Sequence, residues 1–541
     1  MRARGDGETS STLRRRVELA LAPDARIWPI LGFAAVVIGC AVRLFRFVDS
    51  PALWLDEAFL AINLMDKSLS DVLGPLEFQQ SAPPGFLIVE KGAELLLGDA
   101  ERSLRLFPFV ASLASVILVA YCARRLLSPP AAALAIVLFA TGEPLLERAA
   151  EVKPYSVDVA VAALLTALTL WVLEAPRGAT AVRAAILGGV GLVSLWFSFP
   201  AVLTLAAAIV AIVIHGLRVG SRRLVVGAVV LGGLAIAMFA AVYAVASSNV
   251  TTISAAIFGG SASSTVERFK VVQELWSVLD NPGAFQNGTA ALAALLVCFG
   301  IVALAWQRSF DRLALITLPS LFAVAAHLLD RYPLGGRFSL FLVPSLLILV
   351  ARGAQATTAW SRRPVLVGAG LTVFLITSPL ALAAYHVLEP PAREDVRPVL
   401  SHLVREWQDG DSLYVYPESQ YALRYYATCD DCAPSGAEFP WPIRIPPPTP
   451  QNPAAPALES VPPALIVGST AAVVDPYVEL ERLPRAGRVW LLFSHVGSHN
   501  GIDPESVFVT ELGRERQPVE AVRARGANLY LFDRMAVDGP G

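Results

Sequence analysis

Long apolar runs separated by short polar segments dominate the chain as far as residue 388. Eleven of these runs have roughly 17 to 25 residues, the length that an α-helix needs to cross a bilayer. The predicted spans are residues 27–48, 106–126, 129–146, 155–174, 182–199, 200–217, 224–247, 288–306, 313–329, 334–351 and 364–388. The span 129–146 is the weakest, because it is short and contains Pro144. The pattern predicts a polytopic α-helical membrane protein with about 11 transmembrane helices.

Charged residues at the ends of the spans indicate an orientation. Residues 1–26 are polar and contain three consecutive arginines, and no A-x-A cleavage site follows the first span. We therefore expect a cytoplasmic tail over 1–26 and an uncleaved anchor over 27–48. With this orientation, arginines accompanied by few acids lie at the inner ends of the spans, whereas acids and bases are mixed at the outer ends. The positive-inside rule then predicts an extracytoplasmic C-terminus.

Residues 389–541 have a different pattern from the spans, with more charges and prolines. The segments "DSLYVYP", "RVWLLFS" and "NLYLFDR" predict buried strands, and "REDVRPVLSHLVREW" predicts an amphipathic helix before the first of them. The Pro-rich segment 433–462 predicts an irregular loop. We expect a transmembrane domain over 27–388 and a C-terminal extracytoplasmic α/β domain over 389–541.

Composition agrees with a membrane location and narrows the partners. Hydrophobic residues make up 55% of the chain and charged residues 16%, against about 25% charged in a typical soluble domain. The net charge of -2 gives no basic footprint, so no nucleic-acid partner is expected. Abundant Ala and Arg with few Lys indicate a bacterium with GC-rich DNA. The expected location is therefore the bacterial inner (plasma) membrane.

Two cysteines, Cys429 and Cys432, form the sequence CDDC in the predicted extracytoplasmic domain. A structural disulfide is plausible there, and a bridge or a pair of free thiols is favoured over redox catalysis because no thioredoxin-like context accompanies the motif. A zinc site would need two further ligands, and none lies at a suitable spacing.

The loop 49–104 is too long for a tight connection between spans. It contains "DEAFLAINLMDKSL" and "PPGFLIVEKGAELLLG", which predict two short amphipathic helices at the membrane interface. The first places Asp56 and Glu57 at its start, facing water or a cavity rather than lipid. Acids in a first helical turn also have a simpler role, since they offset the helix dipole.

The motifs in this loop and beyond it, taken in order, resemble the GT-C type of integral-membrane glycosyltransferases. The resemblance is to the dolichyl-phosphate-mannose–protein mannosyltransferases, glycosyltransferase family 39, which include protein O-mannosyltransferases and the bacterial aminoarabinose transferase acting on lipid A. The segments that carry it are "LWLDEAF", "SAPPGFLIVEKGAELLLGDAERSLRLFPFVAS", "LLERAAEVKPYSVDVAVAAL", "DRYPLGGRFSLFLVPSL" and "GDSLYVYPESQYALRYYA". They span most of the chain. One departure stands out: Ser81 and Ala82 precede the paired prolines, where the family usually has His or Glu-Lys.

This resemblance implies a polyprenyl-phosphate-linked sugar donor and an acceptor hydroxyl on a protein, lipid or polysaccharide outside the cytoplasm. Transfer with inversion is a single displacement, for which a carboxylate is a competent base. Asp56 is the predicted base, and Glu57 would orient the site. The leaving phosphate needs positive charge or a metal ion. Candidate phosphate-binding residues are Arg102, Arg105, Arg148, Lys153, Tyr155, Arg331 and Arg337. A divalent metal is a candidate cofactor, with His327 as its candidate ligand.

Several of these residues also have simpler interpretations. Arg102 and Arg105 could extend to lipid headgroups, and Arg148 with Lys153 could form solvated ion pairs with neighbouring acids. A lone helix histidine such as His327 is more often structural. Two alternative functions remain: a polar-lipid transporter or flippase, and a catalytically silent GT-C scaffold. Because the helix middles are nearly uncharged and the charges gather at one face, the pattern favours chemistry at the outer face over transport.

Overall fold

The computed structural model describes residues 25–176, 178–258, 273, 276–280, 285, 289–390, 393–429, 432, 465–469, 475–497, 501 and 503–534, with the backbone alone over 247–258. The predicted tail up to residue 24 and the Pro-rich segment 433–462 lie outside these residues. The chain divides into two compact units. The helical unit comprises Met1–Val48, Ser81–Phe86 and Leu106–Pro390, and the α/β unit comprises Asp49–Gln80, Leu87–Arg105 and Pro391–Gly541.

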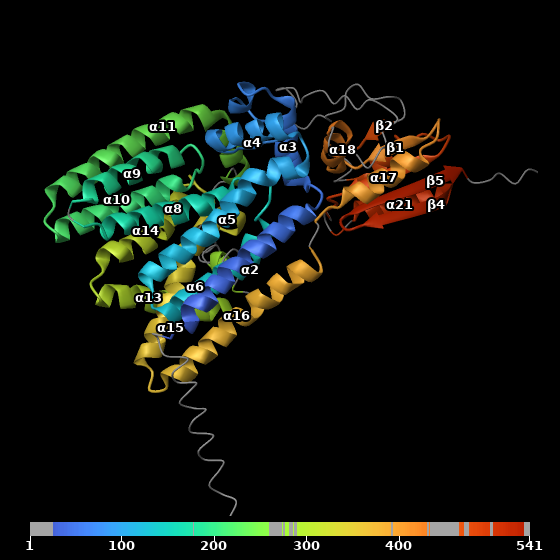
Figure 1. The fold of residues 1–541 in the computed structure, drawn as a ribbon. Helices are drawn as coiled ribbons and strands as arrows, with labels where there is room; N and C mark the ends of the chain where they lie inside the picture. The colour runs from blue at the N-terminus through green and yellow to red at the C-terminus, as the bar shows by residue number, and fades with distance from the viewer. Residues whose placement is uncertain are drawn as a thin grey trace, which may run out of the picture. The chain divides into compact units, whose positions relative to one another are not determined.

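Helices account for nearly all of the described part of the helical unit (Figure 1). They are α2 (Ile27–Asp49), α5 (Glu101–Leu126), α6 (Pro129–Thr141), α7 (Glu143–Glu147), α8 (Tyr155–Leu173), α9 (Thr180–Ser194), α10 (Ala201–Arg218), α11 (Arg222–Phe258), α13 (Thr289–Trp306), α14 (Phe310–Leu328), η2 (Gly336–Leu342), α15 (Val343–Trp360) and α16 (Pro364–Leu388). Within the described residues, nine helical segments are long and apolar enough to cross a membrane. The prediction of a polytopic α-helical membrane protein is therefore confirmed.

The remaining two predicted spans are helices that are shorter than expected. The segment 129–146 forms α6, which ends at Thr141, and then the separate five-residue α7. Gly142 has an extended backbone and Pro144 cannot continue the hydrogen-bond ladder of α6, so the break follows from the sequence. The segment 182–199 forms α9 of 15 residues. Both count among the shorter apolar helices of 10 to 17 residues.

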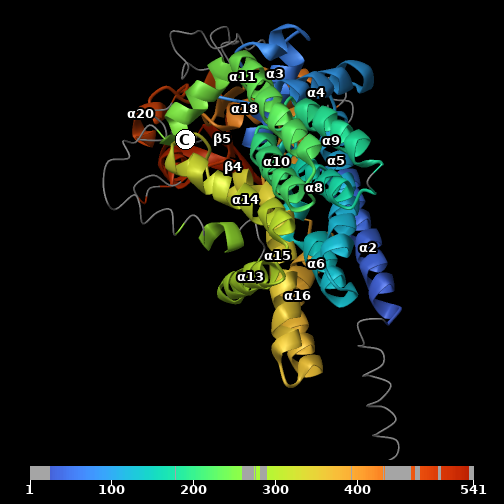
Figure 2. The ribbon, with the colours of Figure 1, turned by 90° about the vertical axis from the view of Figure 1, so that its left-hand side faces the viewer.

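Small residues allow the helices of this unit to approach closely. Gly300 on α13 and Gly353 on α15 face one another's backbones. A Cβ atom at Gly353 would overlap the carbonyl oxygen of Leu296, and one at Gly300 would overlap that of Leu349. Such contacts between small residues are a usual way for membrane helices to associate. Figure 2 shows α13 beside α15.

The α/β unit contains a five-stranded mixed sheet in the order β2-β1-β3-β5-β4. Its elements are α3 (Leu55–Asp66), η1 (Asp71–Leu73), α4 (Pro84–Leu97, which begins in the helical unit), α17 (Val396–Glu406), β1 (Ser412–Val415), α18 (Ser419–Thr428), β2 (Leu465–Val467), α20 (Pro476–Leu480), β3 (Val489–Ser494), α21 (Pro504–Glu515), β4 (Arg516–Ala524) and β5 (Ala527–Arg534). Strand β1 is parallel to β2 and β3, whereas β5 is antiparallel to β3 and β4. The predicted C-terminal α/β fold is confirmed.

Helices cover both faces of this sheet, which explains why β3 is buried at every position. Its alternate residues Val489, Leu491 and Phe493 pack with Phe508 and Leu512 of α21. On the other face, the ring of Trp490 contacts His402 of α17. A strand buried on both faces reads as a continuous apolar run, as "RVWLLFS" does.

Candidate active site

The two adjacent acids of the loop 49–104 lie in the first turn of α3, as predicted. Their environments differ. Glu57 is 2% exposed, whereas Asp56 is only partly buried. Trp54, the residue before the helix, makes no side-chain cap. The start of α3 is therefore held by residues from elsewhere in the α/β unit.

Arg105 binds Glu57 through two parallel hydrogen bonds. Nε of Arg105 is 2.9 Å from Oε1 of Glu57, and Nη2 is 2.6 Å from Oε2. Nη1 of Arg105 donates to the carbonyl oxygen of Pro51 at 2.5 Å. Arg105, predicted to contact phosphate or headgroups, thus has its guanidinium directed at the segment leading into α3. Arg102 lies one turn earlier on α5 and is exposed.

Aromatic and charged residues of the C-terminal segment hold the same loop. The backbone N–H of Leu53 donates to the hydroxyl of Tyr426 at 2.8 Å, and that hydroxyl donates to Glu101 at 2.8 Å. Arg397 of α17 donates to the carbonyl oxygen of Ser50 at 3.0 Å. The entry to α3 is therefore bonded to both α17 and α18.

A second group of predicted residues surrounds Tyr155 in the helical unit. The guanidinium carbons of Arg148 and Arg337 each lie 5.6 Å from the centre of the Tyr155 ring. Arg148 also pairs with Glu151 through bonds of 2.8 and 2.9 Å, so the predicted local ion pair is present. Burial alone would lower the pKa of Arg148, but Glu151 and Glu147 outweigh it and raise the pKa.

A small pocket adjoins this group. Its volume is about 10 Å³, room for about one water molecule. Arg148, Tyr155 and Ser156 line it together with Arg43 and Ser112. Sequence reasoning missed Arg43, which is fully buried in the middle of the first span and donates to Ser112 Oγ at 3.0 Å and to the carbonyl oxygen of Ala140 at 2.9 Å. An arginine inside an apolar span was the available signal.

The other predicted residues differ from one another in burial. Lys153 is 5% exposed, and Arg331 is exposed at the end of α14. Nδ1 of His327 is 3.3 Å from the backbone nitrogen of Leu334. Buried Asp158, in the first turn of α8, was not predicted. The roles assigned to all these residues stay predictions.

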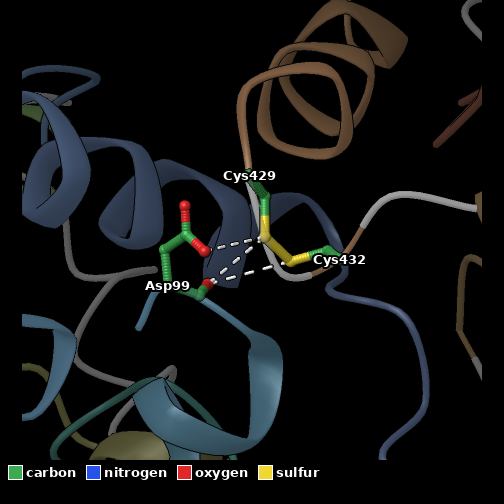
Figure 3. A group of neighbouring side chains, drawn as sticks. All are labelled: Asp99, Cys429 and Cys432. Atoms are coloured by element: carbon green, nitrogen blue, oxygen red, sulfur yellow. Dashed lines mark hydrogen bonds between the residues drawn. A yellow bond between two sulfur atoms is a disulfide. The ribbon is translucent and has the colours of Figure 1, made fainter. Parts of the chain in front are cut away.

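Asp99, Cys429 and Cys432 form a group of neighbouring polar side chains in the α/β unit (Figure 3). Their ligand atoms lie within 4.8 Å of one another, the one such group of three His, Cys, Asp or Glu residues that the described residues contain. The two cysteines are joined as a disulfide, so neither sulfur is a thiolate available to a metal. Sγ of Cys429 lies 3.3 Å from Oδ1 of Asp99. His327, the predicted metal ligand, is not part of this group.

Comparisons with known proteins agree with the motifs. Residues 81–245 match the family model of the dolichyl-phosphate-mannose-protein mannosyltransferases. No curated protein matches the chain. The structure is similar to that of ArnT from Cupriavidus metallidurans in the apo state, with 14% identity, a TM-score of 0.51 and coverage of 92% of this chain and 97% of that one. The same protein bound to undecaprenyl phosphate gives 14% identity, a TM-score of 0.50 and coverage of 95% and 99%. The structural similarity shows the shared fold, and with the family match it confirms the predicted resemblance.

Proposed function

We propose that this chain, a membrane protein of the GT-C glycosyltransferase type, transfers a sugar from a polyprenyl-phosphate donor to an acceptor hydroxyl on the extracytoplasmic face. Two comparisons support the donor class. The matching family is that of the dolichyl-phosphate-mannose-protein mannosyltransferases, and the similar ArnT was solved bound to undecaprenyl phosphate. The multi-pass helical fold agrees with a lipid-linked donor. The bacterial inner membrane remains the proposed location.

The observation that carries this proposal is the difference in burial between the two adjacent acids, Glu57 and Asp56. Glu57 is buried against Arg105, and the pair fixes the start of α3 through Pro51. Asp56, one residue earlier, keeps a side chain that is only partly buried. A partly buried carboxylate on a firmly held helix suits a general base.

In the proposed reaction, the acceptor hydroxyl oxygen attacks the anomeric carbon while Asp56 takes its proton. The bond from the anomeric carbon to the phosphate oxygen breaks, and polyprenyl phosphate leaves with the electron pair. The configuration at the anomeric carbon is inverted by this single displacement. Glu57 takes no proton in this scheme and acts by holding the helix.

We propose Arg148, Arg337 and Tyr155 as the donor phosphate-binding residues. Two guanidinium groups gathered at one ring concentrate positive charge, and arginine can bind two phosphate oxygens at once. Lys153, Arg331 and Arg102 are further candidates, and a metal ion at His327 remains a separate proposal. The C-terminal domain is proposed to position the acceptor. Truncation of 395–541 that left activity and acceptor range unchanged would contradict that last role.

A complementation experiment tests the proposal. The gene is deleted and restored as the wild type, as Asp56→Asn or as Asp71→Asn, and envelope glycans are compared by mass spectrometry at matched membrane abundance. Asp71 is the control, because it is an exposed acid of the same loop that bonds only locally to Ser68. We expect the wild type and Asp71→Asn to restore a missing sugar and Asp56→Asn to fail.

The other results have distinct meanings. Equal restoration by wild type and Asp56→Asn would show that Asp56 is not the base. If no form, including the wild type, altered any glycan, the transporter or silent-scaffold interpretation would replace the enzyme. The mass difference restored by the wild type would identify the class of sugar.

A further inference from the structure

Glu394, at the start of the C-terminal domain, caps the helix that carries Asp56. Its Oε2 accepts a hydrogen bond of 3.0 Å from the backbone N–H of Leu55, the first residue of α3. Its other oxygen, Oε1, lies 2.5 Å from Nδ1 of His495. Glu394 is buried, with 6% of its side chain exposed, and His495 is 43% exposed. A carboxylate in this position satisfies an N-terminal donor and offsets the helix dipole.

The position of Glu394 is fixed by its neighbours on both sides. The backbone N–H of Asp395 donates to the carbonyl oxygen of Arg525 at 2.7 Å. Gly526, next in the turn between β4 and β5, has φ of +69°, and a Cβ atom there would overlap the carbonyl oxygen of Arg393. The guanidinium of Arg393 lies 4.3 Å from the ring centre of Trp54, just before α3. The chain around Glu394 is therefore held against both the turn and the entry to the acidic helix.

His495 follows strand β3 directly and has φ of +54°, an uncommon conformation for a residue other than glycine. Three carboxylates act on its imidazole: Glu394 by a hydrogen bond and by charge, and Glu418 and Asp56 by charge. The bond from Glu394 is the largest influence. Together these acids raise the pKa of His495 although burial opposes them. The imidazolium form is thus favoured where His495 binds Glu394.

We propose that Glu394 and His495 are a positioning pair for Asp56: Glu394 orients the start of α3, and the His495 cation favours the ionised carboxylate of Asp56. This inference rests on the proposed role of Asp56 as the base. His495 does not touch the reacting atoms and exchanges no proton with substrate. Glu394 accepts through Oε2 from the backbone N–H of Leu55, the residue before Asp56. Its Oε1 binds His495, which brings the imidazole to the start of α3. A cation at this place attracts the negative charge of Asp56. Through this pair, residues of the C-terminal domain would orient the helix that carries Asp56 and attract its negative charge.

The test measures the ionisation of Asp56 without requiring turnover. Carbodiimide couples an amine to protonated carboxyl groups, so the pH midpoint of labelling at Asp56, read by peptide mass spectrometry, reports its ionisation. The full-length protein in detergent is compared as wild type and as His495→Asn, since asparagine tolerates the left-handed backbone. We expect the Asp56 midpoint to rise by about half a pH unit in the variant.

Two further variants separate charge from structure. His402→Asn removes another acid-paired histidine, which lies 3.0 Å from Glu520, and we expect it to leave the Asp56 midpoint unchanged. His495→Lys keeps a cation and should restore most of the wild-type midpoint, which a merely structural role would not produce. An unchanged midpoint in His495→Asn with an intact fold overturns the inference. If His495→Asn does not fold, His495→Lys decides. A folded His495→Lys whose Asp56 midpoint differs from that of the wild type overturns the inference.

Failure of this inference is distinguishable from failure of the proposed function. The labelling midpoint reports coupling between His495 and Asp56 whether or not a sugar is transferred. The glycan comparison with Asp56→Asn reports the base itself. In the glycan assay at pH 5.5 and pH 7.5, His495→Asn should lose more restoration at the lower pH, because Asp56 would be protonated more readily. Equal loss at both values would contradict a positioning role through charge.

Discussion

Glu57 and Arg105, 48 residues apart in the chain, form a two-point ion pair that joins the start of α3 to the start of α5. Both side chains are buried, at 3% and 2% exposed. A buried pair of this kind stabilises little beyond the desolvation that it must offset. Its consequence is geometric: the helix that carries Asp56 is held in one orientation relative to residues 101–105, which belong to the same unit.

Removing one member of this pair should strongly destabilise the α/β unit. Arg105→Gln leaves the Glu57 carboxylate buried without its partner, which costs about 3–5 kcal/mol of unfolding free energy. Urea titration of the purified protein, followed by circular dichroism, measures the change. Arg125→Gln is the control, because Arg125 is 50% exposed in its pair with Glu174 and should cost less than about 1 kcal/mol. Equal costs for the two variants would argue against a buried pair.

The bond between His495 and Glu394 predicts a pH-dependent contribution to stability. The folded-state pKa of His495 is raised above the unfolded value, chiefly by the bond to Glu394. The contribution is therefore fully present below the unfolded pKa, about 6.5, and is lost as the pH rises through the raised folded pKa. Glu418 and Asp56 act on the imidazole in the same direction. Because His495 is 43% exposed, solvent screens part of this contribution.

Thermal unfolding at pH 5.5 and pH 9 measures this contribution. The wild type should exceed His495→Asn in melting temperature by a larger margin at pH 5.5 than at pH 9. Salt should reduce the margin, since the pair is partly exposed. A margin that is independent of pH would show that His495 contributes by packing alone.

Much of the local structure followed from periodic patterns in the sequence. Helix α17 buries Val396, Val399, Leu400 and Leu403, the spacing expected of an amphipathic helix. Strand β4 was missed because most of its residues are exposed and its polar and apolar residues follow no regular alternation. Strand β2 has only three residues. The sheet class was predictable, whereas the edge strands on both sides were not.

The candidate site was predictable only in part, for a physical reason. Asp56 and Glu57 were found because they are adjacent acids in an aromatic segment, and the family resemblance gave them a role. Glu394 lies 339 residues from Leu55 and 101 from His495, and no local pattern connects them. Arg43 was overlooked although an arginine inside an otherwise apolar span is visible in the sequence. Long-range pairing of polar groups is set by tertiary packing, which a single sequence does not display.

The Cys429–Cys432 disulfide should stabilise the end of α18 near Asp99. Closing so short a loop stabilises by about 2 kcal/mol in the chain-entropy description, so reduction or Cys429→Ser should lower the stability of the α/β unit by about that amount. Alkylation before and after a reductant, followed by mass spectrometry, measures the pairing. After unfolding in sodium dodecyl sulfate, the free cysteine Cys298 should be labelled in both states. Labelling of Cys429 without a reductant would contradict the bridge.

The contact between α13 and α15 predicts a sharp difference between two glycines in neighbouring helices. Gly353→Ala adds a Cβ that would overlap the carbonyl oxygen of Leu296, and backbone cannot rotate away as a side chain can. The helices must separate, so we expect a loss of about 1–3 kcal/mol and a lower melting temperature. Gly370→Ala on α16 meets nothing within 4 Å and should be neutral or slightly stabilising, since alanine favours helix. Similar melting temperatures for the two variants would mean that α13 and α15 do not pack through Gly353.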